Sequence, residues 1–174
     1  MIISVDKVKQ HVNTTKDETV LGEMLQALEL LIRKYTNNKF QKVNIRTSCQ
    51  VMTRKLYTSY PYFKVGDTVE ISQSIYNDGL YVVKETDGEF IILDKDLVDE
   101  ATVLVTKVEY PMDVQMGVLT MLEWDLKNRK KVGIQSETIS RHSVTYYDQS
   151  ASNTVMGYPI SLLGFLKPYM KCRF

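Results

Sequence analysis

The four residues best suited to bind a metal or to act as nucleophiles lie far apart in the sequence. His11, Cys49, His142 and Cys172 each stand alone, whereas a zinc site needs pairs of such ligands at close spacing. His142 and Ser143 are neighbours, but adjacent side chains of an extended strand point to opposite faces, so they cannot share a proton. We therefore expect no metal, no cofactor and no catalytic residue, and both cysteines to be reduced.

Two further patterns that bind ions or phosphates are incomplete or missing. The acidic stretch Asp94 to Glu100 begins like a calcium loop, but it lacks the glycine at the sixth position and the glutamate at the twelfth. The eight glycines form neither of the glycine-rich patterns that cradle nucleotide phosphates. Solvated turn residues explain the acidic stretch better than a calcium site, and the sequence argues against phosphate binding by a glycine-rich loop.

A run of basic residues offers a candidate contact for phosphate. Lys127, Arg129, Lys130 and Lys131 close a predicted helix, where cations stabilise the negative end of the helix dipole without any partner. The alternative is a patch that touches DNA in a channel, or RNA. We favour the solvated helix end and keep the phosphate contact as the alternative.

An aromatic cluster admits two interpretations. Tyr57, Tyr60, Tyr62 and Phe63 could form a stacking platform or a partner interface, because tyrosine is common where one side is apolar and the other wet. The same residues could instead pack a β module against helices. The sequence favours neither interpretation.

Helical spacing of apolar residues dominates both ends of the chain. The sequence predicts four helices, at about residues 5–13, 17–35, 111–131 and 159–168. Ser4 is placed to cap the first helix, Thr15 and Glu18 have the capping-box spacing before the second, and Pro111 suits the first turn of the third.

Short β-rich runs separated by turn residues replace the helical spacing between Tyr60 and Pro111. The sequences Asn-Asp-Gly79 and Asp-Gly88 between apolar runs predict hairpins. We expect about four or five strands here, in a small antiparallel barrel or sheet. A weaker strand-like stretch at 41–52 precedes this region, and an extended stretch at 133–148 follows the third helix.

These elements predict an α+β protein with a mainly α-helical core of about four helices and an inserted small antiparallel β-barrel or sheet module. The helical domain is discontinuous, at 1–59 and 111–174, and the β module occupies 60–110. A length of 174 residues suits one main core with room for such an insert. The polar N-terminus and the lack of a long apolar stretch predict synthesis in a cytoplasm and no membrane role.

The charge balance argues against a dedicated nucleic-acid binder. Twenty-two basic residues against 21 acidic ones leave a formal net charge of +1. The hydrophobic fraction of 44% and the charged fraction of 25% are those of an ordinary folded protein. Any contact with DNA is therefore expected to be local or transient.

Three segments, taken in order, resemble the head-tail connector family of tailed bacteriophages, also called head-completion adaptors. They are ETVLGEMLQALELLIRKYTNNKF, YPMDVQMGVLTMLEWDLKNRKK and GIQSETISRHSVTYYD, and a closing helix that ends in LKPYMKCRF follows them. In the third segment, Ser136-Glu137 and the later Ser143-Val-Thr-Tyr146 are similar to a characteristic stretch of the family. The resemblance covers about two-thirds of the chain. Residues 60–110 depart from it, since the shortest members lack this segment.

The resemblance implies a virion protein that forms a homo-oligomeric, dodecameric ring at the head-tail junction. Such a ring docks beneath the portal protein and above a head-closure (stopper) or tail-completion protein, and packaged double-stranded DNA passes transiently through its lumen. By the same resemblance the closing segment contacts the portal. Its candidate contact residues are Leu166, Lys167, Pro168, Tyr169, Met170, Lys171, Cys172, Arg173 and Phe174.

Two other classes of function stay open at this point. In a nucleic-acid-binding module, Tyr76, Tyr81 and Phe90 would stack on bases and the basic run would meet phosphate. An enzyme has the least support, because the best evidence for one would be a conserved polar cleft, which a single sequence does not show. The adaptor is the leading hypothesis, since a nearly neutral protein surrounds DNA without gripping it and so does not oppose ejection.

Overall fold

The computed structural model describes residues 1–58, 60–129, 136–139, 142–145 and 153–172. The chain divides into two compact units. The barrel unit comprises residues 1–2 and 38–110, and the helical unit comprises residues 3–37 and 111–174. Each unit has its own set of buried side chains, as described below.

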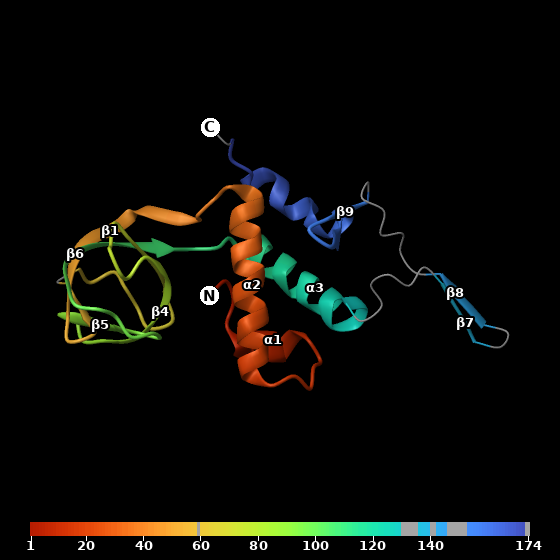
Figure 1. Cartoon of the computed structure of the whole chain (residues 1–174), viewed down its shortest axis with the longest axis horizontal. Coiled ribbons are helices and arrows are strands. Elements are labelled where there is room, and N and C mark those ends of the chain that lie inside the picture. Colours follow the sequence, from red (N-terminus) through yellow and green to blue (C-terminus); the bar gives the residue numbers. More distant parts are fainter. Residues whose placement is uncertain (59, 130–135, 140–141, 146–152, 173–174) are drawn as a thin grey trace. The chain divides into compact units, whose positions relative to one another are not determined.

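The barrel unit is a closed antiparallel β-barrel (Figure 1). Its strands are β1 (Gln41–Met52), β2 (Lys55–Tyr57), β3 (Thr68–Ser72), β4 (Gly79–Thr86), β5 (Phe90–Leu93) and β6 (Glu100–Val108). Their order around the barrel is β1-β2-β5-β4-β3-β6, and β6 closes it by pairing with both β3 and β1. Because the barrel closes, each of its strands pairs with a neighbouring strand on either side.

Inward-facing side chains fill the barrel. They come from all six strands and from the connecting loops, and include Cys49, Val51, Leu56, Phe63, Val69, Ile71, Tyr81, Val83, Ile91, Leu93, Leu97, Val103 and Val105. Both turn sequences join paired strands as predicted, since β4 pairs with β3 on one side and with β5 on the other. Gly88 adopts φ +96°, which favours glycine, and Asp87 Oδ1 accepts two backbone hydrogen bonds in the same turn.

The prediction of a mainly α-helical core is wrong. Helices make up about 36% and strands about 30% of the structure, and the four strands within residues 60–110 are joined by two earlier ones in a barrel of six. The additional strands β1 and β2 come from residues 41–57, so the β-rich part begins at Asn38 and not at residue 60. Only Cys49 and Val51 among the twelve residues of β1 are buried, which is why its apolar pattern is weak.

The helical unit is built from both ends of the chain. It contains α1 (Val5–His11), α2 (Glu18–Thr36), α3 (Met112–Asn128) and the 3₁₀ helix η2 (Ile160–Tyr169) (Figure 1). The helix α2 packs against α1, α3 and η2, and α3 also packs against η2. The buried apolar side chains of these helices include Val8, Leu21, Leu25, Leu28, Ile32, Val114, Val118, Leu122, Leu163 and Leu166.

Local interactions fix the ends of the first two helices. Ser4 Oγ accepts a hydrogen bond from the first turn of α1, as predicted. The predicted capping box before α2 does not form, because α2 begins at Glu18 without a side-chain cap and the Glu18 carboxylate pairs with Lys9 Nζ. Asn37 ends α2 in the left-handed region at φ 49°, a conformation that asparagine tolerates.

Two small hairpins complete the helical unit. The strands β7 (Ser136–Ile139) and β8 (His142–Thr145) pair with each other, with Ser136 opposite Thr145. The strands β9 (Thr154–Val155) and β10 (Tyr158–Pro159) form the second pair. None of the helices in the described ranges combines the length and the apolarity that a membrane span requires.

Candidate functional site

The isolated histidines and cysteines do not come together in the described residues. His11 is exposed at the end of α1, where its Nδ1 lies 2.8 Å from the Lys7 carbonyl oxygen. Cys49 lies in the barrel core and Cys172 is exposed in the helical unit. Within the ranges that the structure describes, no three His, Cys, Asp or Glu side chains are placed to hold a metal ion. The His142 and Ser143 side chains lie outside the described set.

The Cys49 thiol is sheltered from solution chemistry. Burial raises its pKa above the ordinary value, and a hydrogen bond with Thr58 offsets only part of that rise. Because the thiolate is the reactive form, this cysteine is a packing residue of the barrel.

Two cations of the basic run already have anionic partners. Lys127 Nζ pairs with Glu123 one helical turn earlier, and Arg129 Nη2 lies 2.9 Å from Asp125 Oδ1. Lys130 and Lys131 lie outside the described residues. The two described cations of the candidate phosphate contact are therefore each paired with a carboxylate one helical turn earlier.

The closing segment is tied to the helical unit by backbone and side-chain hydrogen bonds. The Lys171 N–H donates to the Thr36 carbonyl oxygen, and Asn37 Nδ2 donates to the Cys172 carbonyl oxygen, each at 2.8 Å. The Tyr169 hydroxyl binds the Asp113 carboxylate. These contacts hold the segment at the C-terminal end of α2 and the start of α3.

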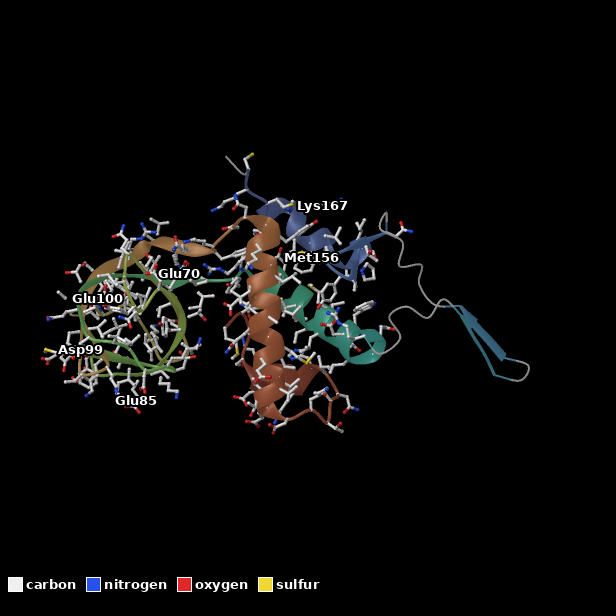
Figure 2. The ribbon with its side chains drawn as sticks, viewed as in Figure 1. Glu70, Glu85, Asp99, Glu100, Met156 and Lys167 are labelled. Atoms are coloured by element: carbon white, nitrogen blue, oxygen red, sulfur yellow. The ribbon has the colours of Figure 1, made fainter. Side chains whose placement is uncertain are left out.

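Side-chain exposure divides the candidate portal-contact residues. Leu166 is fully buried in its own unit, whereas Lys167 (labelled in Figure 2), Pro168 and Met170 are exposed. Arg173 and Phe174 lie outside the described residues. A portal contact through this segment would therefore use the exposed positions, with Leu166 anchoring them.

The aromatic cluster is only partly a surface feature. Phe63 belongs to the barrel core, and Tyr60 packs against that core while its hydroxyl donates to the Asn44 carbonyl oxygen. The Tyr62 ring is exposed and lies edge-on to Tyr60, with ring centroids 4.9 Å apart. Packing therefore explains most of this cluster.

The three rings proposed for base stacking do not form one platform. Tyr81 is buried in the barrel core and its hydroxyl donates to the Asn77 carbonyl oxygen. Phe90 is covered by Lys55 Nζ, 3.9 Å from its centroid, and of the three rings only Tyr76 is exposed, at 68%. The core position of Tyr81 weighs against the nucleic-acid interpretation.

The helical unit contains a pocket that the sequence analysis did not find. Its volume is about 370 Å³. The apolar wall comes from Met24, Leu28 and Leu31 of α2 and from Leu126 of α3. The polar side is formed by Asp125, Arg129 and Tyr158, and Lys16 lies at the pocket as well. The pocket is therefore mainly apolar, with two cations and one carboxylate in its lining.

A buried polar network forms the polar side of this pocket. The Tyr158 hydroxyl donates to Asp125 Oδ2 at 2.5 Å, and Arg129 Nη2 donates to the Tyr158 hydroxyl at 3.1 Å. Asp125 is only 8% exposed. Its other oxygen, Oδ1, accepts no hydrogen bond from any residue in the described ranges, although it has the ion-pair contact with Arg129.

Burial and a carboxylate neighbour keep Tyr158 in its neutral form. Burial raises the pKa of Tyr158 far above its ordinary value, and the hydrogen bond to Asp125 raises it further. Arg129 opposes this rise but does not reverse it, while its guanidinium lies 5.1 Å from the centre of the Tyr158 ring. Tyr158 is therefore a fixed hydrogen-bond donor.

The β3–β4 connection of the barrel holds the second feature that the sequence analysis missed. Glu100, labelled in Figure 2, accepts hydrogen bonds from Ser74 Oγ, from the Ile75 N–H and from Asn77 Nδ2. Asn77 is 2% exposed and also bonds both the N–H and the carbonyl oxygen of Val98. The two loops are thus fixed to each other.

This network presents three exposed apolar side chains. Ile75 is 79%, Tyr76 is 68% and Val98 is 53% exposed. The hydrogen bonds from Ser74 and the Ile75 backbone lower the pKa of Glu100, so it stays ionised in its role as acceptor. We call Ile75, Tyr76 and Val98 the apolar knob.

A weak sequence clue existed for each feature. Asp125 lies at the helical spacing of the apolar residues Val118 and Leu122 on α3. This spacing indicates that its carboxylate faces the apolar side of the helix. Ile75 and Tyr76 directly precede the turn sequence Asn-Asp-Gly79, and large apolar residues are uncommon beside such turns. Comparisons of the chain with protein-family models and with curated proteins find no match.

Proposed function

We propose that the chain is a structural adaptor of a tailed-bacteriophage virion. It assembles as a homo-oligomeric ring at the head-tail junction, between the portal and a head-closure or tail-completion protein. Packaged DNA passes through its lumen, and the chain catalyses no reaction.

The β7–β8 hairpin is the observation that carries this proposal. It lies within the stretch that resembles the characteristic segment of the connector family, between α3 and η2. The two strands pair with each other in a two-stranded sheet. A lone hairpin is marginally stable in water and its outer edges can accept another strand, which suits a segment that completes its sheet in an assembly.

The charge arrangement of α3 also supports a ring around DNA. Lys127 and Arg129 are paired with Glu123 and Asp125 within the same helix. Paired cations release few counterions from DNA and bind it weakly. Weak binding suits a lumen through which DNA must move.

Native mass spectrometry of the purified chain, alone and mixed with the portal protein encoded nearby in its genome, tests the proposal. We expect a closed ring, or a complex with the portal that has a matching copy number. Mass spectrometry of purified virions should also detect the chain. A chain that stays monomeric with the portal present and is missing from virions would overturn the proposal.

A further inference from the structure

We propose that the pocket of the helical unit receives the apolar knob of a second copy of this chain, with the Tyr76 ring stacked on Arg129. The pocket and the knob belong to different units of the chain. Repeated from copy to copy, such a heterologous contact generates a ring or a filament. The inference therefore rests on the proposed adaptor function and names the residues that join its subunits.

The pocket has the size and lining that an aromatic anchor needs. Its volume of about 370 Å³ lies in the range of small binding pockets, roughly 300–1,000 Å³. Met24, Leu28 and Leu126 offer apolar surface for a ring and an aliphatic side chain. Methionine adapts its shape to an incoming group, which suits a surface that is covered on assembly.

Arg129 provides the specific contact. Its guanidinium lies over the Tyr158 ring, and its side chain is still 51% exposed. A planar guanidinium stacks on aromatic rings, so its exposed side can take a second ring. Tyrosine and arginine are also the side chains that most often dominate the energy of protein interfaces.

The knob is built to dock with little loss of entropy. Its backbone is held by Glu100 and Asn77, so Ile75 and Tyr76 are displayed on an ordered loop. Preorganised loops lose less freedom on binding, which leaves more of the contact energy as affinity. Tyr62 is also exposed, but its ring already packs against Tyr60.

Charge complementarity selects a second copy as the occupant. The pocket lining holds two cations, Lys16 and Arg129, and one carboxylate, Asp125, which pairs with Arg129, so Lys16 leaves it with an excess positive charge. Exposed carboxylates flank the knob, since Asp78 follows Tyr76 closely and Asp99 follows Val98. Opposite charges around an apolar contact favour this pairing and its orientation.

Disulfide cross-linking between two variants tests the contact. Both variants carry Cys172→Ser, and Cys49 is left in the barrel core. One variant carries Tyr76→Cys and the other Met24→Cys, so a disulfide between them can form only between two chains. The matched control replaces Tyr76→Cys by Tyr62→Cys, at the other exposed tyrosine. The mixtures are oxidised with and without the portal protein, and assembly is followed by native mass spectrometry.

We expect the Tyr76–Met24 pair to form the inter-chain disulfide and the Tyr62–Met24 pair not to form it, because bridged Cα atoms must lie within about 7 Å. Assembly without this disulfide would overturn the inference and leave the adaptor function standing. The disulfide without any portal complex would support the contact and count against the adaptor. The absence of both the inter-chain disulfide and assembly would also overturn the contact between copies.

A second measurement needs no cysteine. Tyr76→Leu keeps an apolar side chain but removes the ring, and we expect it to weaken self-association about tenfold. Tyr62→Leu should leave the association unchanged. Equal dissociation constants for the two variants in sedimentation velocity would contradict stacking on Arg129.

Discussion

At the scale of single residues, the hydrogen bond between Tyr158 and Asp125 stabilises the polar side of the pocket. Replacing Tyr158 by Phe leaves Asp125 Oδ2 buried without its hydroxyl donor. A buried acceptor that loses its partner costs about 1–3 kcal/mol, so we expect Tyr158→Phe to lower the free energy of unfolding by that amount. Urea unfolding followed by Trp124 fluorescence measures the change, because this single tryptophan packs against Tyr158.

Tyr169→Phe is the matched control for that substitution. It also removes a hydroxyl from an aspartate, but Asp113 is exposed and water can replace the lost donor. We expect a loss below about 1 kcal/mol. If both variants lost the same free energy of unfolding, burial would not explain the contribution of the Tyr158–Asp125 hydrogen bond to stability.

The raised pKa of Tyr158 predicts a loss of stability in alkaline solution. An unfolded tyrosine releases its proton near pH 10, whereas folded Tyr158 retains it to higher pH. Above about pH 10 the unfolded chain thus binds fewer protons than the folded chain, so stability falls as pH rises and is unaffected below that value. The fall should be shallower in Tyr158→Phe, as urea unfolding at pH 9 to 11 would show. Parallel pH profiles for the two proteins would contradict a raised pKa at this site.

At the scale of the elements, two helical glycines have opposite environments. A Cβ atom at Gly117 of α3 would lie 2.3 Å from Phe165 Cζ of η2, whereas a Cβ at Gly22 of α2 would meet no atom within 4 Å. Alanine favours a helix interior by up to about 1 kcal/mol over glycine, while overpacking costs about 1–3 kcal/mol. We expect Gly22→Ala to raise the unfolding temperature and Gly117→Ala to lower it. Calorimetry on both variants measures this, and a higher unfolding temperature for Gly117→Ala would show that the ring moves aside freely.

The sequence predicted individual elements better than their partners. The helix spacing located α2 and α3, and the turn sequences located the β3–β4 and β4–β5 hairpins, because these patterns are local. Closure of the barrel depends on β1 pairing with β6, about sixty residues further along the chain, and no local pattern encodes such a pair. The pocket was missed for the same reason, since Tyr158 and Asp125 are 33 residues apart.

At the scale of the whole molecule, the adaptor proposal requires a portal contact separate from the contact between copies. The exposed part of the closing segment is the candidate, and among its described residues Met170 is a large apolar side chain with 50% exposure. A charge placed in an apolar interface core must be desolvated there, which opposes binding. We therefore expect Met170→Asp to weaken portal binding by tenfold or more while the chain stays folded.

Met156 provides the control for this last prediction, because it is similarly exposed, at 43%, and lies outside the closing segment of the same unit (Figure 2). Met156→Asp should leave portal affinity within about twofold of the unsubstituted chain. Surface plasmon resonance on immobilised portal measures both variants, and circular dichroism checks their fold. Equal weakening would indicate a general effect of added charge, and no weakening by Met170→Asp would move the portal contact away from the closing segment. In either case a ring or portal complex seen by native mass spectrometry would still support the adaptor function. The affinity measurement therefore tests only the location of the portal contact, and native mass spectrometry tests the function.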